Sequence, residues 1–424
     1  MKSILIKGGK VFDPSQNLER VADVLIEAGK IKSVGKAARK ASITIDAKGL
    51  IVAPGLIDMH VHLREPGNED EETIASGSAA AVAGGFTSVA CMPNTDPPVD
   101  NEASAEFVFL QAERARMANI YPIGTITMGR EGVDIAEIGQ LSRGGVVGFS
   151  DDGDTVQNAG VMRIALQYAR MFDRPIISHC EDKNLVGSGV MHSGYVSMVL
   201  GLPGMPSAGE EIIVNRDITL AETTGAKLHI AHVSTAGSVD LIRRAKKRGV
   251  KVTAEVTPHH LALTDECVRS YDPNFKMNPP LRTEKDQKAL LKGLKDGTID
   301  VIASDHAPHT VEEKDVEFGL APFGVIGMES TLGVLFKTLI RKKVLTLSQM
   351  IAKLTVGPAR VLGIPKGTLR PGADADVTII DPDLEWTIDA SKFKSKSRNC
   401  PFHGWKVKGK AVRTIVGGEI RCEE

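Results

Sequence analysis

The chain has 424 residues, enough for one large domain and a smaller one, and its 52 lysine and arginine residues balance 53 aspartate and glutamate residues. This balance argues against a nucleic-acid partner. The five cysteines are scattered without a Cys-x-x-Cys pair, and no segment approaches the roughly 18 consecutive apolar residues of a membrane span, so we expect a cytoplasmic protein without disulfides.

Both ends of the chain contain short strand-like segments broken by glycine. Near the N-terminus these are Ser3–Lys7, Val21–Glu27, Lys30–Val34 and Ile43–Asp46. Near the C-terminus they are 368–369, Val377–Ile380, Trp386–Ile388 and Ala411–Val416. Because neither end has enough strands to bury a core alone, we expect one β-sandwich assembled from residues 1–52 and 365–424.

Residues 53–364 alternate short apolar strands with helix-length amphipathic segments, which is typical of βα units around a parallel sheet. We expect eight strands, at 56–63, 86–92, 120–126, 146–151, 175–180, 227–233, 251–256 and 299–304. The helical segments between them include Glu71–Ala83, Ala103–Met117, Gly160–Met171, Glu210–Thr224, Ser238–Arg248 and Lys285–Leu294. This pattern predicts an α/β fold, a TIM (β/α)8 barrel, with a doubly wound sheet as the alternative.

Two histidines end the first of these strands. His60 and His62 are two residues apart, so on a strand both side chains leave from one face and can reach one ion. Residues of metal-binding types also end four later strands: Asp151 with Asp152, His179, His232 and Asp305. Buried ionisable groups need partners, and strand ends meet in a ring only in a barrel. The pattern therefore favours the barrel and predicts a site for Zn²⁺ or a similar divalent ion.

Several motifs in one order make the chain similar to a known family. The run Gly-Leu-Ile-Asp-Met-His-Val-His-Leu-Arg at 55–64 resembles the opening of the amidohydrolase superfamily. With 91–95 (Cys-Met-Pro-Asn-Thr), 278–282 (Asn-Pro-Pro-Leu-Arg), 304–309 (Ser-Asp-His-Ala-Pro-His) and Ser395–Phe402, the chain resembles bacterial class I dihydroorotases. The resemblance implies a TIM barrel with a small β-sandwich from both termini. It also implies zinc-dependent, reversible cyclisation of N-carbamoyl-L-aspartate to L-dihydroorotate in de novo pyrimidine biosynthesis.

The same resemblance implies roles for individual residues. One zinc ion would be bound by His60, His62 and Asp305, and a second by His179 and His232. Asp152 would bridge the two ions, with Asp151 as its rival, and Asp305 would also be the catalytic residue that moves a proton. The implied substrate-binding residues are His62, Arg64, Asn94, Asn278, His309, Phe323 and Gly324. Arg64 also suits this role chemically, because a guanidinium matches the geometry of a carboxylate.

Two alternatives remain at this point. Hydantoinases and allantoinases carry a carboxylated lysine at the end of strand four, where this chain has Phe-Ser-Asp-Asp-Gly at 149–153. A non-catalytic homologue that scaffolds aspartate carbamoyltransferase should have lost metal ligands, and every ligand position is filled here. We therefore expect an active enzyme that forms a homo-oligomer and has a small-molecule substrate. Aspartate carbamoyltransferase is a candidate partner of this enzyme.

Overall fold

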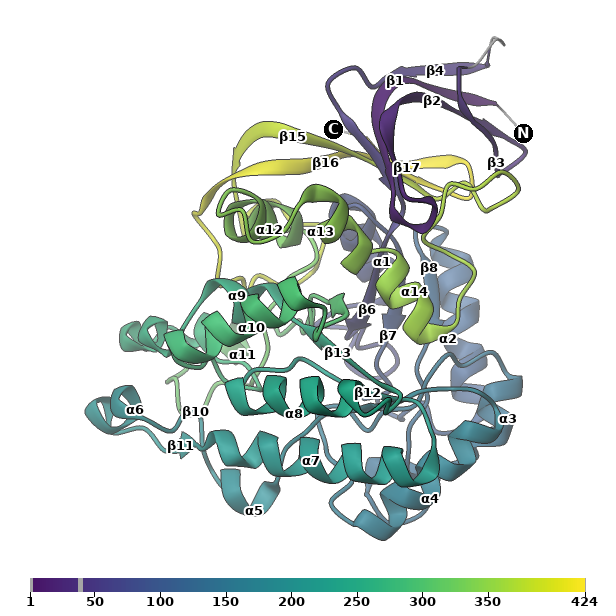
Figure 1. The fold of residues 1–424 in the computed structure, drawn as a ribbon. Helices are drawn as coiled ribbons and strands as arrows, with labels where there is room; N and C mark the ends of the chain where they lie inside the picture. Colours follow the sequence, from purple (N-terminus) through teal and green to yellow (C-terminus); the bar gives the residue numbers. More distant parts are fainter. Residues whose placement is uncertain (1–2, 37–40, 424) are drawn as a thin grey trace.

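The computed structural model describes residues 3–36 and 41–423. The chain forms a barrel covered by helices and a separate β-sheet that joins both ends of the chain (Figure 1). Residues 1, 2, 37–40 and 424, which the predicted β-sandwich includes, lie outside the described residues. The purple strands of the N-terminus and the yellow strands of the C-terminus lie side by side at one end of the molecule (Figure 1).

The terminal sheet has the strand order β17-β16-β15-β5-β1-β2-β3, with β4 paired to β1. Its core draws on both ends of the chain, because Ile6 and Val24 are buried in one cluster with Val377 and Ile415. The predicted boundaries at residues 52 and 364 stay predictions, and β5 spans the first. The strands are β1 (Ile4–Asp13), β2 (Leu18–Glu27), β3 (Lys30–Gly35), β4 (Ile43–Asp46), β5 (Ile51–Pro54), β15 (Val377–Thr387), β16 (Lys406–Val416) and β17 (Glu419–Glu423).

One predicted terminal strand is wrong. Residues 368 and 369 are not part of a strand. Instead, the backbone N–H of Leu369 donates to the side chain of Asp13 over 2.7 Å. A side-chain acceptor thus takes the backbone donor that a neighbouring strand would otherwise use.

The central strands close into a parallel ring, which confirms the TIM barrel and rules out the doubly wound sheet. The pairs β6-β7-β8 and β9-β12-β13-β14 are parallel. A parallel bridge from Val61 to His306 closes the ring between its first and last strands. The regular strands are β6 (Leu56–Val61), β7 (Phe86–Cys91), β8 (Asn119–Pro122), β9 (Ile176–Ser178), β12 (Leu228–Ile230), β13 (Val252–Val256) and β14 (Val301–Ile302).

The predicted fourth strand, 146–151, is present only as a single bridging residue. Phe149 pairs with Gly124 on one side and Ile176 on the other. The chain leaves the strand at once because the carboxylate of Asp151 accepts the backbone N–H groups of Ile126 and Thr127 at 2.7 and 3.1 Å. The fourth position of the barrel therefore exists, without a regular strand.

Helices surround the barrel close to their predicted positions. In α10, the Thr283 side chain accepts the N–H of Asp286 at the start, and Gly297 with φ of +83° follows the end. The main helices are α1 (Ile74–Ala83), α2 (Glu102–Ala115), α3 (Ile138–Arg143), α4 (Ala159–Met171), α7 (Ser207–Thr224), α8 (Ala236–Lys247), α10 (Glu284–Asp296), α13 (Leu347–Lys353) and α14 (Val356–Leu362). Shorter elements in the loops are α5 (Lys183–Val186), β10 (Met191–His192), α6 (Tyr195–Leu200), β11 (Gly204–Met205), α9 (Pro258–Ala262), α11 (Val311–Lys314) and α12 (Thr331–Leu335).

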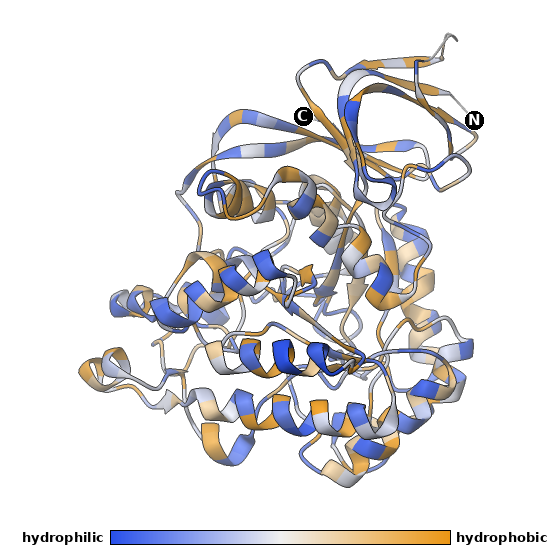
Figure 2. Ribbon diagram, viewed as in Figure 1, coloured by the Kyte–Doolittle hydropathy of each residue, from blue (hydrophilic) through white to orange (hydrophobic). Residues whose placement is uncertain are grey.

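One buried hydrophobic cluster takes side chains from strand after strand of the ring. It includes Met59, Ala90, Ile123, Ile177 and Val301, together with residues of α14. In Figure 2, hydrophilic and hydrophobic residues are mixed along α7 and α10, as expected of helices with one face on a barrel and one in water. Within the described part of the chain, none of the helices combines the length and the apolar character needed to cross a membrane.

The terminal sheet rests on the barrel domain where β16 meets the π-helical turn Phe336–Ile340. Gly409 in β16 has φ of +87°, and a Cβ there would collide with the ring of Phe336. Gly372 has φ of +89° with open space around it. These two glycines have the same backbone conformation and different surroundings.

We predict that Gly409→Ala destabilises the protein by about 2–4 kcal/mol, because it combines a left-handed backbone with overpacking. Gly372→Ala should cost only the backbone part, about 1–2 kcal/mol. Urea unfolding of both variants measures the difference. Equal losses would show that the contact of Gly409 with Phe336 is unimportant.

Candidate metal centre and substrate pocket

The carboxylate of Asp152 lies among four histidine rings at the strand ends. Its Oδ2 is 3.5 Å from Nε2 of His60 and 3.5 Å from Nε2 of His62. Its Oδ1 is 3.5 Å from Nδ1 of His179 and 3.3 Å from Nε2 of His232. Each carboxylate oxygen thus faces a different pair of histidines.

Asp305 completes the cluster from the last strand of the barrel. Its Oδ1 is 3.5 Å from Nε2 of His60 and 3.3 Å from Nε2 of His62. The predicted ligands therefore come together, and all six are buried: His60, His62, Asp152, His179, His232 and Asp305.

This cluster fits a metal ion. Within this cluster, candidate ligand atoms lie within 4.8 Å of one another in two sets, His60 with His62 and Asp305, and His60 with Asp152 and His232. The Nε2 atom of His60 is buried without a hydrogen-bond partner, which is rare for a buried polar atom. Imidazole and carboxylate donors are those that zinc and similar divalent ions prefer.

The electrostatics of the cluster also favour a cation. Burial lowers the pKa of His60, but the carboxylates of Asp152, Glu255 and Asp305 outweigh it and hold the pKa well above its usual value. Burial opposes ionisation of Asp305, yet the nearby histidines, His60 first, lower its pKa to about 2. They likewise hold the pKa of Asp152 well below its usual range. Both carboxylates are therefore ionised at neutral pH.

The structure separates the two rival aspartates of strand four. Asp151 points away from the histidines and accepts hydrogen bonds from the backbone of Ile126 and from the backbone and hydroxyl of Thr127. Asp152 is the aspartate that faces the histidines. The sequence left this choice open because the directions of the two neighbouring side chains depend on the irregular backbone at the end of the strand.

Sequence reasoning missed the partner that orients His60. Glu255 in β13 is fully buried, and its Oε1 lies 2.5 Å from Nδ1 of His60. Its Oε2 lies 3.1 Å from Nε2 of His229, and its Oε1 also accepts the backbone N–H of His232. A carboxylate on the second nitrogen of a ligand histidine fixes the ring and its tautomer. The sequence signal for this role is a single glutamate within the otherwise uncharged strand β13.

Three site residues have an unusual backbone conformation. The φ angle is +63° at Arg64, +30° at His232 and +50° at Asp305. Such values are costly for residues other than glycine and concentrate at functional sites. Here they turn the side chains into the barrel mouth just as each strand ends, which strand parity alone does not predict.

A cavity of about 190 Å³ opens beside the cluster. Its lining includes every predicted substrate-binding residue, in addition to Asp152, His179 and Asp305: His62, Arg64, Asn94, Asn278, His309, Phe323 and Gly324. The structure thus brings the two predicted groups, metal ligands and substrate contacts, to one place.

The guanidinium of Arg64 is held in this cavity from three sides. Its Nε lies 2.6 Å from the carboxylate of Glu71, and its Nε and Nη2 donate to the carbonyl of Pro308 at 3.1 and 3.0 Å. Its Nη2 is 3.3 Å from Nε2 of His309, which is also 2.8 Å from the carbonyl of Phe323. Burial, and after it the charge of Arg64, lowers the pKa of His309 to about 3. His309 is therefore neutral beside a fixed positive charge.

The two asparagines lie at the edge of the histidine cluster. Oδ1 of Asn94 is 2.8 Å from Nδ1 of His62, so it orients that ring. Nδ2 of Asn278 donates to Glu181 over 2.8 Å, while its Oδ1 is buried without a partner. Asn278 thus presents an acceptor that a ligand N–H can satisfy.

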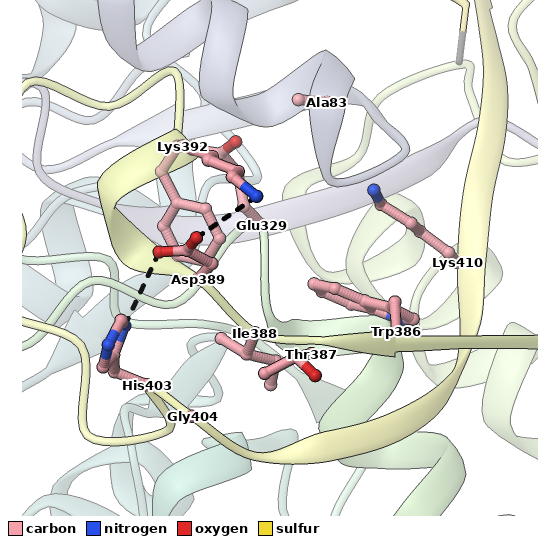
Figure 3. Close-up of a pocket in the computed structure, with 11 residues that line it drawn as sticks. Ala83, Glu329, Trp386, Thr387, Ile388, Asp389, Lys392, His403, Gly404 and Lys410 are labelled. Atoms are coloured by element: carbon pink, nitrogen blue, oxygen red, sulfur yellow. Dashed lines mark ion pairs between the residues drawn. The ribbon is translucent and has the colours of Figure 1, made fainter.

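A larger cavity lies elsewhere, next to the paired strands β15 and β16, and has a volume of about 630 Å³. Figure 3 shows Trp386 and Lys410 on one side of it and Glu329 on another, with Asp389 paired to Lys392 and His403. None of the residues that line it also lines the cavity beside the histidine cluster. Volume alone would therefore point to the wrong place for chemistry.

Comparison with known proteins places the chain in a family. Residues 51–421 match the model of the Amidohydrolase family. The dihydroorotase of Pelotomaculum thermopropionicum is 58% identical over 422 residues, which cover 99% of each chain. The dihydroorotase of Geobacter metallireducens is 53% identical over 420 residues, again 99% of each.

A solved structure with a similar fold is the L-hydantoinase (dihydropyrimidinase) from Arthrobacter aurescens, with a TM-score of 0.90 and 27% sequence identity. The alignment covers 100% of this chain and 96% of that one. The sequence, the barrel and the metal-type cluster at its strand ends agree. The chain belongs to the amidohydrolase family and, within it, to the dihydroorotases.

Proposed function

We infer that the protein is a dihydroorotase that catalyses the reversible closure of N-carbamoyl-L-aspartate to L-dihydroorotate in pyrimidine biosynthesis. The observation that carries this conclusion is one small cavity that is lined both by residues of the Asp152–histidine cluster and by Arg64. A cyclic amide with a carboxylate matches both groups. A non-catalytic homologue is disfavoured because all six ligand candidates are present and adjacent.

We propose that the cluster binds two zinc ions. His60, His62 and Asp305 would hold one ion, His179 and His232 would hold the other, and Asp152 would use one oxygen for each. When bound, such ions polarise an amide carbonyl and acidify water. Glu255 and Asn94 keep the rings of His60 and His62 in place for this role.

Asp305 is the proposed proton carrier. Its carboxylate is ionised at neutral pH and lies at the boundary between the histidine cluster and the cavity. In the hydrolytic direction it accepts a proton from the attacking water and returns it to the leaving ring nitrogen. In the cyclisation direction the same proton moves in reverse.

The remaining cavity residues bind and orient the substrate. Arg64 offers its guanidinium to the carboxylate that takes no part in bond making, with the neutral His309 beside it. The free Oδ1 of Asn278 suits a ring N–H, and Asn94 is a further polar contact. Phe323 and Gly324 also line the cavity and would offer main-chain contacts to the substrate.

We also propose a cytoplasmic homo-oligomer, with aspartate carbamoyltransferase as a candidate partner. Tyr195, Met198 and Val199 of α6 support a contact with another subunit, because their side chains are exposed together on a short projecting helix. The composition and the absence of a disulfide pattern support the location.

The first prediction tests the substrate. The purified zinc-loaded protein should hydrolyse dihydroorotate and leave hydantoin and allantoin largely unreacted, measured by loss of ring absorbance. Arg64→Lys keeps the charge but loses the two-pronged donor, so its KM for dihydroorotate should rise about 10–100-fold. Preference for hydantoin, or an unchanged KM in Arg64→Lys, would contradict the assignment.

The second prediction concerns Asp305→Asn. The amide keeps the size and one ligand oxygen but cannot carry a proton, so kcat should fall about 100–10,000-fold while metal remains bound. Elemental analysis and turnover are measured on the same sample. Near-normal turnover in the metal-replete variant would exclude the proton-carrier role.

The third prediction concerns the bridge. Metal-free protein should regain activity with zinc alone, with or without bicarbonate, because Asp152 and not a carboxylated lysine joins the ions. Asp152→Ala should lose one zinc ion per subunit, since His179 and His232 then supply only two ligands. Asp151→Ala is the matched control and should keep both ions at lower stability. Reconstitution that requires bicarbonate would show that the bridge is wrongly assigned.

A further inference from the structure

A segment of the C-terminal part of the chain returns to the mouth of the barrel. We call residues Ser395–Phe402 the tail strap; they precede β16 and lie far in sequence from the strand ends. Ser395, Ser397, Asn399, Cys400 and Phe402 of this segment are all buried. The segment carries one of the motifs that resemble the dihydroorotases, and the proposed function gives it no role.

The tail strap is anchored at its start by two glutamates. Glu329, at the edge of the cavity in Figure 3, accepts the backbone N–H groups of Lys394 and Ser395 at 2.8 and 3.1 Å. Glu72, just before α1, accepts the hydroxyl of Ser395 and the backbone N–H of Lys396. The Ser397 hydroxyl donates to the carbonyl of Glu71 over 2.8 Å.

Asn399 reaches two further loops with one side chain. Its Nδ2 donates to the carbonyls of Ala307 and Gly324 at 3.0 and 3.1 Å, and its Oδ1 accepts the backbone N–H of His309 at 3.4 Å. Its own carbonyl accepts the N–H of Ile326 over 3.0 Å. All polar atoms of the Asn399 side chain are used, and the residue is only 3% exposed.

The three residues that the Asn399 side chain binds all line the substrate cavity: Ala307, His309 and Gly324. They belong to two loops. The loop after β14 contacts Arg64 directly, through the Pro308 carbonyl and His309, and the loop at Phe323–Gly324 contacts it through His309, whose Nε2 is 2.8 Å from the Phe323 carbonyl. A separate loop, between β6 and α1, supplies Glu71, whose carboxylate pairs with Arg64 and whose carbonyl accepts the Ser397 hydroxyl. The tail strap therefore contacts all three of these loops.

We propose that Asn399 is a positioning residue for the part of the cavity that binds the substrate carboxylate. By joining the loop after β14 to the loop at Phe323–Gly324, it fixes the distance between His309 and the opposite backbone. This inference rests on the proposed function and assigns a role to the tail strap. Asn399 itself does not line the cavity.

An anchor that served only stability would give a different result. Loss of the Asn399 amide frees two loops that face the substrate, while the metal cluster keeps its own support from Glu255 and Asn94. The defect should therefore appear in substrate binding and leave metal binding intact. A purely structural residue would lower stability with no change in KM.

The experiment compares Asn399→Ala with Asn119→Ala in the full-length zinc-loaded protein. Asn119 is the matched control, since its Nδ2 donates to the Thr87 carbonyl over 2.9 Å at the start of β8, the opposite end of the barrel. We expect the KM of Asn399→Ala for dihydroorotate to rise about 10–100-fold, with kcat within about threefold and unchanged zinc content, because misplaced binding groups weaken substrate binding. Asn119→Ala should lose stability without a change in KM.

Asn399→Asp is the second variant, for use if the alanine variant does not fold. It keeps the shape and the acceptor for His309 but points an oxygen at the carbonyls of Ala307 and Gly324, so the same rise in KM is expected. A KM within twofold of wild type in a folded Asn399 variant would overturn this inference alone. A wild-type enzyme without activity on dihydroorotate would overturn the proposed function as well.

Discussion

The buried carboxylate of Asp152 among four imidazoles is the interaction on which the site depends. A buried charge is costly unless it is paired, and here His60 and His62 face one oxygen while His179 and His232 face the other. The histidines come from three strands and the aspartate from a fourth, so only a closed barrel brings them within contact distance. The parallel bridge between Val61 and His306 is therefore as important for the chemistry as for the fold.

Further contacts hold the side chains of this cluster in position. Glu255 contacts His60 on the side away from Asp152 and is itself contacted by His229, so that a row of buried polar groups links β6, β13 and β12. Left-handed backbone at Arg64, His232 and Asp305 turns their side chains inward at the strand ends. Such conformations persist only where the surroundings hold them.

The substrate side of the cavity is built in a different way. Its residues belong to loops, which have little internal hydrogen bonding to define their positions. The guanidinium of Arg64 donates to the carbonyl of Pro308 and pairs with the carboxylate of Glu71. The tail strap forms hydrogen bonds with the same loops. A segment that is remote in sequence thereby shapes the pocket. The terminal sheet contributes to the site because the tail strap connects two of its strands, β15 and β16.

The sequence by itself determined the strand and helix alternation, the paired parity of His60 and His62, and the residue types at the strand ends, because these follow from local periodicity and composition. It also carried the motifs that identify the family. Only the tertiary structure decided which of Asp151 and Asp152 meets the histidines, that the fourth strand shrinks to Phe149, and that Glu255 and Asn399 support the site. Those features depend on contacts between residues up to 195 positions apart, as for His60 and Glu255, and no local pattern encodes such a distance.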